Sequence, residues 1–202
     1  MAPVRQPEET RMKILETALD LFHRGTFKGT SVNQIVDQAG ITKGALFHHF
    51  KGKNELGYAV VDELLLGHVN EAWVEPLSTS VDPLSDLMAI INGFREEMEE
   101  CAEVVECGCP LNNLSQEMSA LDDEFRLRLL KLYNIWEEAI EKALRAGIDA
   151  GNVKADVDPL VMSKTLVALL EGCIGMIKVN RTMEHMMIIG AGIRTVLDSM
   201  KP

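Results

Sequence analysis

The sequence has few cysteines and no long uninterrupted apolar run, and each shortage excludes a class of protein. Four cysteines in 202 residues are too few for a scaffold built on disulfides. The chain does not open with a basic stretch, an apolar stretch and a cleavage site, so we expect no secretion signal. The longest apolar region, residues 160–179, contains Lys164, Glu171 and Lys178, which a membrane span tolerates poorly. We therefore expect a soluble, cytoplasmic protein with no membrane segment.

Patterns for catalysis and for metal binding are also lacking. The five histidines, at positions 23, 48, 49, 68 and 185, include no H-E-x-x-H or comparable spacing. His48 and His49 are adjacent, so their side chains would point about 100° apart on a helix. Neither has a cysteine or a carboxylate four positions away to complete a metal site. We expect no catalytic residue, no metal and no cofactor.

Helical periodicity is what the sequence does contain. Hydrophobic residues make up 47% of the chain, enough to fill a core. Leu15, Ala18, Leu19 and Phe22 recur at the spacing of one helical face, and no segment alternates convincingly as a strand does. The pattern predicts an all-α fold of about nine helices, with an irregular stretch at residues 103–110. After the first, the helices are expected near residues 31–39, 42–50, 53–73, 83–101, 110–118, 122–150, 159–179 and 182–200.

Charge is distributed unevenly along the chain. The net charge is −11, yet residues 1–57 hold eight Lys and Arg against six Asp and Glu, whereas the rest hold 12 against 25. A slightly basic segment joined to an acidic body suggests a small module that faces a polyanion. Ordinary scatter of charge is the alternative that charge alone leaves open.

Two short helices lie close together in the basic segment. Ser31, with a glutamine three positions later, forms a capping box for the first helix, and Gly40 ends it. Thr42 is a good N-cap for the second, and Ile41 and Leu46 are spaced as a hydrophobic staple. Two helices joined by so short a turn have helix-turn-helix spacing. The first can rest on the DNA backbone while the second enters the major groove, which is about 12 Å wide.

The second of these helices supplies most of the candidate DNA contacts. Ser31 and Thr42 stand at helix N-termini, which bind phosphate through free N–H groups, and Lys53 adds a positive charge at the start of the following helix. The candidates for the groove face are Lys43, Gly44, Ala45, Phe47, His48 and His49. Gly44 and Ala45 are small, so the backbone can approach the bases closely. Packing within the protein is the alternative for Phe47 and His49, and Phe50 is expected in the core.

Residues 11–56 form one long ordered motif, RMKILETALDLFHRGTFKGTSVNQIVDQAGITKGALFHHFKGKNEL. Its pieces are ALDLF followed by Gly25, then TSVNQIVDQAGITKGALFHHF, then KGKNEL. In this order they resemble the DNA-binding domain of the TetR/AcrR family of bacterial regulators. The resemblance covers about a quarter of the chain.

The resemblance implies an all-helical homodimer that consists of a DNA-binding helix-turn-helix domain, residues 1–55, and a ligand-binding and dimerisation domain, residues 56–202. It implies that a ligand changes the spacing of the two recognition helices and releases an operator. By position, it implies phosphate contacts at Ser31, Thr42 and Lys53, and groove contacts at Lys43, Ala45, His48 and His49. Position 47 is usually tyrosine in this family, with a hydroxyl that reaches a phosphate. Phe47 lacks that hydroxyl, so the ring would contact a sugar or a thymine methyl, or the backbone contact would be absent.

A second unusual segment is ECGCPLNNLSQEM, residues 106–118. Cys109 precedes the first residue of a predicted helix, where a thiol is more reactive, and Cys107 is placed as a resolving thiol. The part CGCPLNNL resembles a segment of a TetR subgroup, some of whose members sense electrophiles or oxidants, while many others bind ordinary small molecules. Three interpretations stay open: buried packing cysteines, a thiol-based sensor, and a metal site that only Cys101 and His68 could help to form.

Apolar residues of the larger domain predict an effector pocket and a dimer interface. The pocket candidates, each of which is also a candidate for ordinary core, are Leu65, Phe94, Met98, Leu114, Tyr133, Trp136 and Met176. Because these side chains are mostly apolar, we expect an apolar or weakly polar effector. The last two helices carry apolar stripes and the small residues Gly172, Cys173 and Gly175, so two from each subunit could form a four-helix interface. An intrachain core is the alternative.

These expectations combine into one function. We expect a repressor that binds a palindromic operator on double-stranded DNA as a dimer and is released by a small-molecule effector. A thiol-sensing repressor that uses Cys107 and Cys109 is the alternative, and an enzyme built on a helical bundle is a remote one. A helical protein–protein adaptor would leave the basic second helix unexplained.

Overall fold

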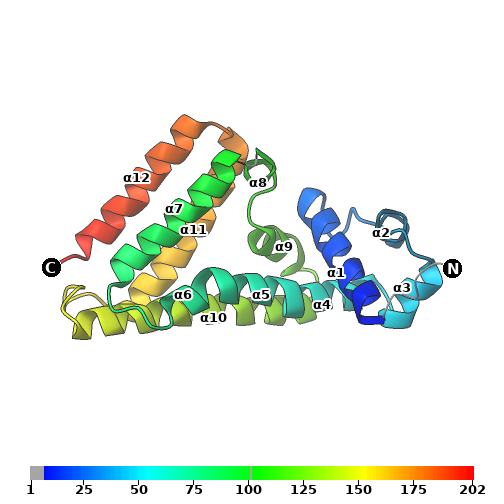
Figure 1. The fold of residues 1–202 in the computed structure, drawn as a ribbon, viewed down its shortest axis with the longest axis horizontal. Coiled ribbons are helices and arrows are strands. Elements are labelled where there is room, and N and C mark those ends of the chain that lie inside the picture. Colours follow the sequence, from blue (N-terminus) through cyan, green and yellow to red (C-terminus); the bar gives the residue numbers. More distant parts are fainter. Residues whose placement is uncertain (1–6, 101) are drawn as a thin grey trace. The chain divides into compact units, whose positions relative to one another are not determined.

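The computed structural model describes residues 7–100 and 102–202, and the regular elements in them are helices (Figure 1). No strand occurs among these residues, which confirms the all-α fold class. The elements are α1 (Pro7–Arg24), α2 (Val32–Ala39), α3 (Lys43–His49), α4 (Lys53–Ala59), η1 (Val60–Leu65), α5 (Leu66–Val69), η2 (Asn70–Val74), α6 (Glu75–Leu77), α7 (Pro83–Glu100), α8 (Ala102–Cys107), α9 (Pro110–Met118), α10 (Asp123–Asp149), α11 (Pro159–Asn180) and α12 (Met183–Ser199).

Two segments differ from the helices that the sequence predicts. The helix expected to end near Trp73 continues to Leu77 and includes two π-helical stretches, η1 and η2. The stretch 103–110, expected to be irregular, is helical as far as Cys107 in α8. That prediction was wrong because Gly108 and Pro110 mark a short break between two helices and not a loop.

The chain forms two compact units. Unit 1 holds the residues up to Gly67 together with Pro110–Leu130, and unit 2 holds His68–Cys109 together with Lys131–Pro202. Each unit combines segments from two distant parts of the sequence, so each core depends on long-range packing.

The core of unit 1 joins α1 to the short helices α2 and α3. Ile14, Leu15 and Ala18 of α1 are fully buried because they lie on the helical face that packs against the other two helices. Ile35 of α2 and Leu46 of α3 are fully buried in the same way. The two short helices are therefore held by tertiary packing, since helices of seven and eight residues are marginal alone.

An aromatic chain extends this core toward α4 and the start of α10. The ring centroids of Phe22 and Phe27 are 5.0 Å apart, those of Phe27 and Phe125 are 4.8 Å apart, and those of Phe125 and Tyr58 are 4.8 Å apart. Gly57 of α4 makes room for two of the rings. A Cβ at this position would lie 2.6 Å from Cζ of Phe125 and 2.7 Å from Cε2 of Phe27. Glycine is therefore required here by close approach and not by its backbone angles.

In unit 2, α12 packs against α7 and α11, and α8 packs against the same two helices (Figure 1). α11 contributes the buried residues Leu166, Val167 and Leu170. By length and composition alone, α11 is the one described helix apolar enough to cross a membrane, a test that the core helix of a soluble protein also passes. These buried residues pack within unit 2.

Candidate functional site

The turn between α2 and α3 sets the geometry of the helix-turn-helix. α2 ends at Gly40, whose φ of 61° lies in the left-handed region that favours glycine. The N–H of Gly40 donates to the carbonyls of Asp37 and Val36, and the N–H of Ile41 donates to Val36 at 3.1 Å. The chain therefore reverses within a few residues, and α3 starts at Lys43.

Side-chain caps hold the N-termini of both helices. The capping box of α2 is confirmed: the N–H of Gln34 donates to Oγ of Ser31 at 3.2 Å, and the N–H of Ser31 donates to Oε1 of Gln34 at 2.7 Å. Oγ1 of Thr42 accepts from the N–H of Ala45 at 3.1 Å. In both caps the hydroxyl oxygen is used as an acceptor, so its proton remains available to donate outward. Ser31 and Thr42 are both exposed.

The outer face of α3 carries the predicted groove residues. Lys43, Gly44, Phe47 and His48 are exposed, Ala45 and His49 are half-buried, and Leu46 and Phe50 are buried. Phe47 is 50% exposed, so its ring is neither core nor free of packing. The His49 ring lies 5.2 Å from that of His48 and 6.3 Å from that of Phe50, measured between centroids. The helix thus presents one lysine, one imidazole and one aromatic ring around a small central glycine.

Lys53 points inward, which the sequence does not predict. Its Nζ donates to the carbonyl oxygens of Phe27 at 3.0 Å and Thr30 at 2.9 Å, and it lies 4.7 Å from the centroid of the Phe27 ring. Burial lowers the pKa of Lys53, and the neighbouring charge of Glu117 opposes this shift. The ammonium therefore ties the start of α4 to the turn that precedes α2.

The same turn is held from its other side by α9. Oε2 of Glu117 accepts from the N–H of Phe27 at 2.7 Å, and Oε1 accepts from the N–H of Lys28 at 2.8 Å. Hydrogen bonds from backbone N–H groups to a carboxylate are among the stronger ones in proteins. Within the turn, Oγ1 of Thr26 accepts from the N–H of Gly29 at 2.8 Å. Because Ser31 follows directly, Glu117 helps to set the position at which α2 begins.

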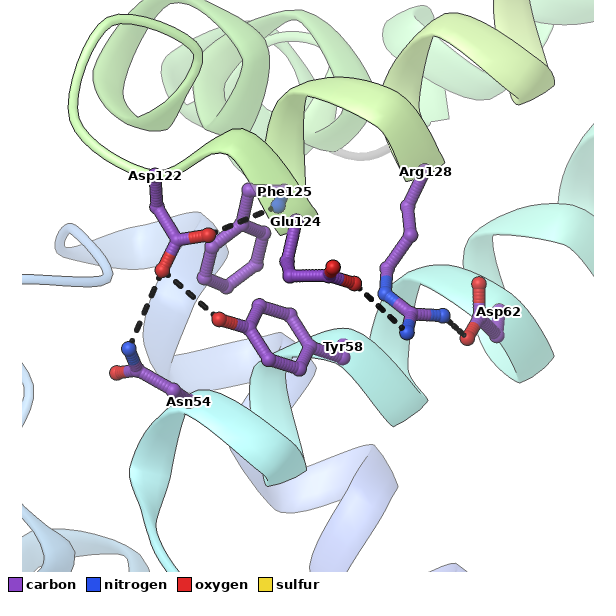
Figure 2. A network of polar contacts seen from close by, with 7 residues as sticks. All are labelled: Asn54, Tyr58, Asp62, Asp122, Glu124, Phe125 and Arg128. Carbon is purple, nitrogen blue, oxygen red and sulfur yellow. Dashed lines mark hydrogen bonds and ion pairs between the residues drawn. The ribbon is translucent and has the colours of Figure 1, made fainter.

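A polar network joins α4 and η1 to the start of α10 within unit 1 (Figure 2). The Tyr58 hydroxyl donates to Oδ2 of Asp122 at 2.8 Å, and Asn54 donates to the same oxygen at 3.3 Å. Arg128 donates to Asp62 and lies 5.0 Å from the centroid of the Tyr58 ring. Burial and the hydrogen bond to Asp122 both raise the pKa of Tyr58.

Asp122 also caps α10, since its Oδ1 accepts from the N–H of Phe125 at 3.1 Å. Burial acts to raise the pKa of Asp122, but the hydrogen bonds from Phe125 and Tyr58 outweigh it, and the pKa is lowered. The ionised carboxylate is therefore the form that this cap holds.

Arg11 joins α1 to η1 and lies against Phe50, the residue that follows α3. Its guanidinium donates to both carboxylate oxygens of Glu63, each at 2.5 Å, and lies 5.1 Å from the centroid of the Phe50 ring. The hydrogen bond raises the pKa of Arg11 and lowers that of Glu63. Phe50, predicted as core, is buried beneath this pair.

The predicted effector residues are divided between the two units. Leu65 and Leu114 are buried in unit 1, whereas Phe94, Met98, Tyr133, Trp136 and Met176 belong to unit 2. In unit 2, the rings of Trp136 and Trp73 have centroids 4.6 Å apart, and those of Trp73 and Phe94 are 5.5 Å apart. Met98 packs against a separate buried cluster. Met176 does not join them: it is 58% exposed, because its position falls on the outward face of α11.

Glu171 is a unit 2 residue that sequence reasoning missed as a site. It is only 7% exposed, and its Oε1 lies 3.4 Å from both the Tyr133 hydroxyl and Sγ of Cys109. A lone acid in the middle of an apolar helix is a sequence signal that could have identified it.

The described residues of the cysteine segment offer no metal cluster. Among the described residues, no group of three or more His, Cys, Asp or Glu could hold a metal ion. Cys107 and Cys109 are half-buried, and Cys101 lies outside the described residues.

Exposed apolar side chains gather on α11 and α12. They are Leu160, Val161, Met176, Val179, Met183, Met187 and Ile188. A Cβ added at Gly172, Gly175, Gly190 or Gly192 would meet nothing within 4 Å. The predicted stripe residues Leu166, Val167 and Leu170 face inward instead and form intrachain core. The surface of these two helices is therefore apolar, with small residues that permit a close approach.

Comparisons with known proteins agree with this geometry. The family model described as bacterial regulatory proteins, tetR family, matches residues 14–60, and the one described as tetracyclin repressor-like, C-terminal domain, matches residues 83–190. The HTH-type transcriptional repressor DhaR of Mycobacterium sp. (strain GP1) is 26% identical over 86% of this chain and 85% of its own length. The HTH-type transcriptional regulator LmrA of Bacillus subtilis is 29% identical over 68% and 72%. The crystal structure of a TetR transcriptional regulator from Chloroflexus aurantiacus superposes with a TM-score of 0.84 at 24% identity, covering 96% of this chain and 97% of that one.

Proposed function

Since this chain belongs to the TetR family of bacterial transcriptional regulators, which bind DNA and are not enzymes, we propose that it is a repressor released by a small-molecule effector. It binds a palindromic operator in the cytoplasm as a homodimer. Residues 1–55 are the DNA-binding domain, and residues 56–202 bind the effector and form the dimer. The observation that carries the proposal is the exposed face of α3, set by caps and a tight turn.

The proposed DNA contacts divide by chemistry. Ser31 and Thr42 bind phosphate through their hydroxyls and the helix N-termini. Lys43 and His48 contact base edges, with Gly44, Ala45 and His49 beside them and the Phe47 ring against a sugar or a thymine methyl. Lys53 supports these contacts indirectly, because its Nζ donates to the carbonyls of the turn before α2.

The proposed dimer interface is the exposed apolar surface of α11 and α12. Val179, at 85% exposure, and Met187, at 62%, would be costly to leave in water, and the open glycines would allow the helices of two subunits to pack closely. Met176 belongs to this surface and not to the effector site.

We propose that effector binding is transmitted to the DNA-binding helices through contacts within unit 1. α9 contacts the turn after α1 through Glu117, and Asp122, just before α10, contacts Tyr58 of α4. A displacement of α9 would therefore move the turn at which α2 begins. We propose that the effector binds at the remaining candidate residues, which are Leu65, Phe94, Met98, Leu114, Tyr133 and Trp136.

Thiol sensing stays the alternative, in which oxidation or alkylation of Cys107 and Cys109 releases the operator. The contact between Sγ of Cys109 and Oε1 of Glu171 disfavours it, because a thiolate would face a carboxylate oxygen. Alkylating the wild type and the double variant Cys107→Ser, Cys109→Ser tests the alternative. Release that the double variant loses would support it, and release that is equal in both proteins would exclude it.

The proposal is tested by titrating the protein onto DNA from upstream of its own gene and onto random duplex, over a range of salt. We expect preferential binding to the upstream DNA, with an affinity that falls steeply with salt. Lys43→Ala should weaken specific binding by about 10-fold or more, because a base-edge contact contributes about 1–3 kcal/mol. Lys131→Ala removes the same charge from an exposed site on α10 and should change little. Equal affinity for random duplex would exclude an operator-specific regulator.

A further inference from the structure

Two charged side chains from distant helices contact the backbone of the turn between α1 and α2. Glu117 accepts through its two carboxylate oxygens, from the N–H of Phe27 at 2.7 Å and from the N–H of Lys28 at 2.8 Å. Nζ of Lys53 donates to the carbonyl oxygens of Phe27 at 3.0 Å and of Thr30 at 2.9 Å. Phe27 and Thr30 are both buried, and buried backbone groups need partners. The position of the turn therefore depends on Glu117 of α9 and Lys53 of α4.

One peptide group of the turn receives both charges. The carbonyl of Phe27 and the N–H of Lys28 belong to the same planar peptide unit. The ammonium of Lys53 lies at the oxygen of this unit, and the carboxylate of Glu117 lies at its N–H. A peptide dipole is negative at its oxygen and positive at its N–H, so both charges stand at favourable ends. Hydrogen bonds to charged groups are also the stronger ones, so this pair fixes the orientation of the peptide group.

Lys53 extends the same control to the first residue of the DNA-binding helix pair. The Thr30 carbonyl, which accepts from Lys53, shares a peptide plane with the N–H of Ser31. That N–H donates to Oε1 of Gln34 at 2.7 Å in the capping box of α2. The direction of the Ser31 hydroxyl, a proposed phosphate contact, therefore depends on a peptide plane that Lys53 holds.

The contacts of Lys53 suit it to hold the turn more than to bind DNA itself. An ammonium has three N–H donors, and two carbonyl oxygens each accept from this one. It also lies 4.7 Å from the centroid of the Phe27 ring. A swing of the side chain toward DNA would give up these contacts and would release the link between α4 and the turn.

We propose that Lys53 and Glu117 act as one pair of positioning residues for operator binding. They hold the Phe27–Lys28 peptide between opposite charges, and this places Ser31 against a phosphate, while Lys53 itself does not contact DNA. The inference rests on the proposed DNA-binding function. It has two consequences: removal of either charge has the same effect as removal of both, and removal of Lys53 does not change the number of phosphates that the protein neutralises.

The first experiment measures amide hydrogen exchange by NMR on the full chain without DNA. The variants are Lys53→Gln, Glu117→Gln and the double variant, with Lys131→Gln as a control that removes the same charge from an exposed site on α10. We expect the amide of Lys28 to exchange at least about 10-fold faster in both single variants, because each frees one edge of its peptide group. The amide of Ala18, in the buried face of α1, should be unchanged and shows that the variants are folded. A Lys28 amide that exchanges equally fast in the wild type and in Lys53→Gln would overturn the pairing.

The second experiment titrates the same proteins onto the upstream DNA over a range of salt. Each single variant should bind about 10-fold more weakly, since a contact to a charged phosphate is lost. The double variant should also bind about 10-fold more weakly, whereas independent residues would give about 100-fold. The slope of log affinity against log salt should be the same for Lys53→Gln and the wild type. A phosphate contact would reduce that slope by about 0.9 for each lysine removed.

A reduced slope in Lys53→Gln, or losses that multiply in the double variant, would overturn the proposal. If Glu117→Gln does not fold, the salt slope of Lys53→Gln still separates a positioning residue from a phosphate contact. Failure of the proposed function looks different: the variants change the exchange of the Lys28 amide, but the wild type does not distinguish upstream DNA from random duplex. A wild type that prefers upstream DNA, with variants that bind as it does, keeps the function and removes the pair.

Discussion

Gly57→Ala tests whether the aromatic core of unit 1 is as tightly packed as the structure shows. The added methyl would lie 2.6 Å from Phe125 and 2.7 Å from Phe27. Carbon atoms in contact normally stand about 3.5–4.0 Å apart, so both rings must move by almost 1 Å. Both rings are buried, at 0% and 3% exposure, and neither is the end of a flexible chain. The substitution therefore overpacks a rigid site.

The magnitude follows from two opposing effects. Overpacking of a well-packed core costs about 1–3 kcal/mol, and two buried rings place this site at the upper end. Replacing glycine by alanine in a helix recovers about 1 kcal/mol of helix propensity. We expect a net loss of about 2 kcal/mol. Gly67→Ala is the matched control, because its Cβ would meet nothing within 4 Å and it should stabilise by up to about 1 kcal/mol.

The assay is urea denaturation followed by circular dichroism, with tryptophan fluorescence recorded in parallel. Both tryptophans lie in unit 2, whereas residue 57 lies in unit 1. If the two units unfold separately, the substitution should shift only the unfolding transition of unit 1, which circular dichroism detects and tryptophan fluorescence does not. A Gly57→Ala variant as stable as the wild type, or one that shifts in the same direction as Gly67→Ala, would refute the close packing of these rings.

Three further predictions follow from the site. Phe47→Tyr should tighten operator binding by about 2- to 10-fold, since a new phosphate hydrogen bond contributes about 0.5–1.5 kcal/mol and the ring is half-exposed; unchanged or weaker binding in an anisotropy titration would contradict it. Glu117→Gln should destabilise the chain by about 1.5–3 kcal/mol in urea and weaken DNA binding, because it removes the charge that holds two backbone N–H groups of the turn before α2; a variant with wild-type stability would show that the turn holds without this charge. Met187→Glu should shift the dimer toward monomer in analytical ultracentrifugation, since it would bury two like charges at the interface, whereas Leu127→Glu, at a similarly exposed site on α10, should not. A Met187→Glu variant that sediments as the wild type would remove this surface from the interface.

Local signals explain what the sequence could predict. The capping residues Ser31 and Thr42 and the breaker Gly40 act on neighbours within four positions, so they specify α2, the turn and α3 without knowledge of the rest of the chain. The apolar periodicity of α1 predicts its buried face for the same reason. α8 was missed because a glycine and a proline two positions apart can mark either a loop or a brief break between helices.

Long-range contacts explain what the sequence could not. Lys53 sits at a helix start like a phosphate ligand, but carbonyls more than 20 positions earlier take up two of its N–H groups. Met176 and Leu170 are both apolar residues of α11, and only packing shows that one is exposed and the other buried. Glu117 acts on a turn 89 and 90 positions away, a distance that no sequence pattern spans.

The sequence by itself therefore determined the helical class, the helix-turn-helix and the family, because caps, breakers and periodicity are local and the motif is long and ordered. The tertiary structure alone decided which lysine faces outward, which apolar side chains of α11 and α12 remain exposed, and that the carboxylate of Glu171 is buried. These features depend on contacts between residues that are far apart in the sequence. Such contacts decide whether a side chain is buried or exposed to water, and therefore its contribution to the free energy of folding.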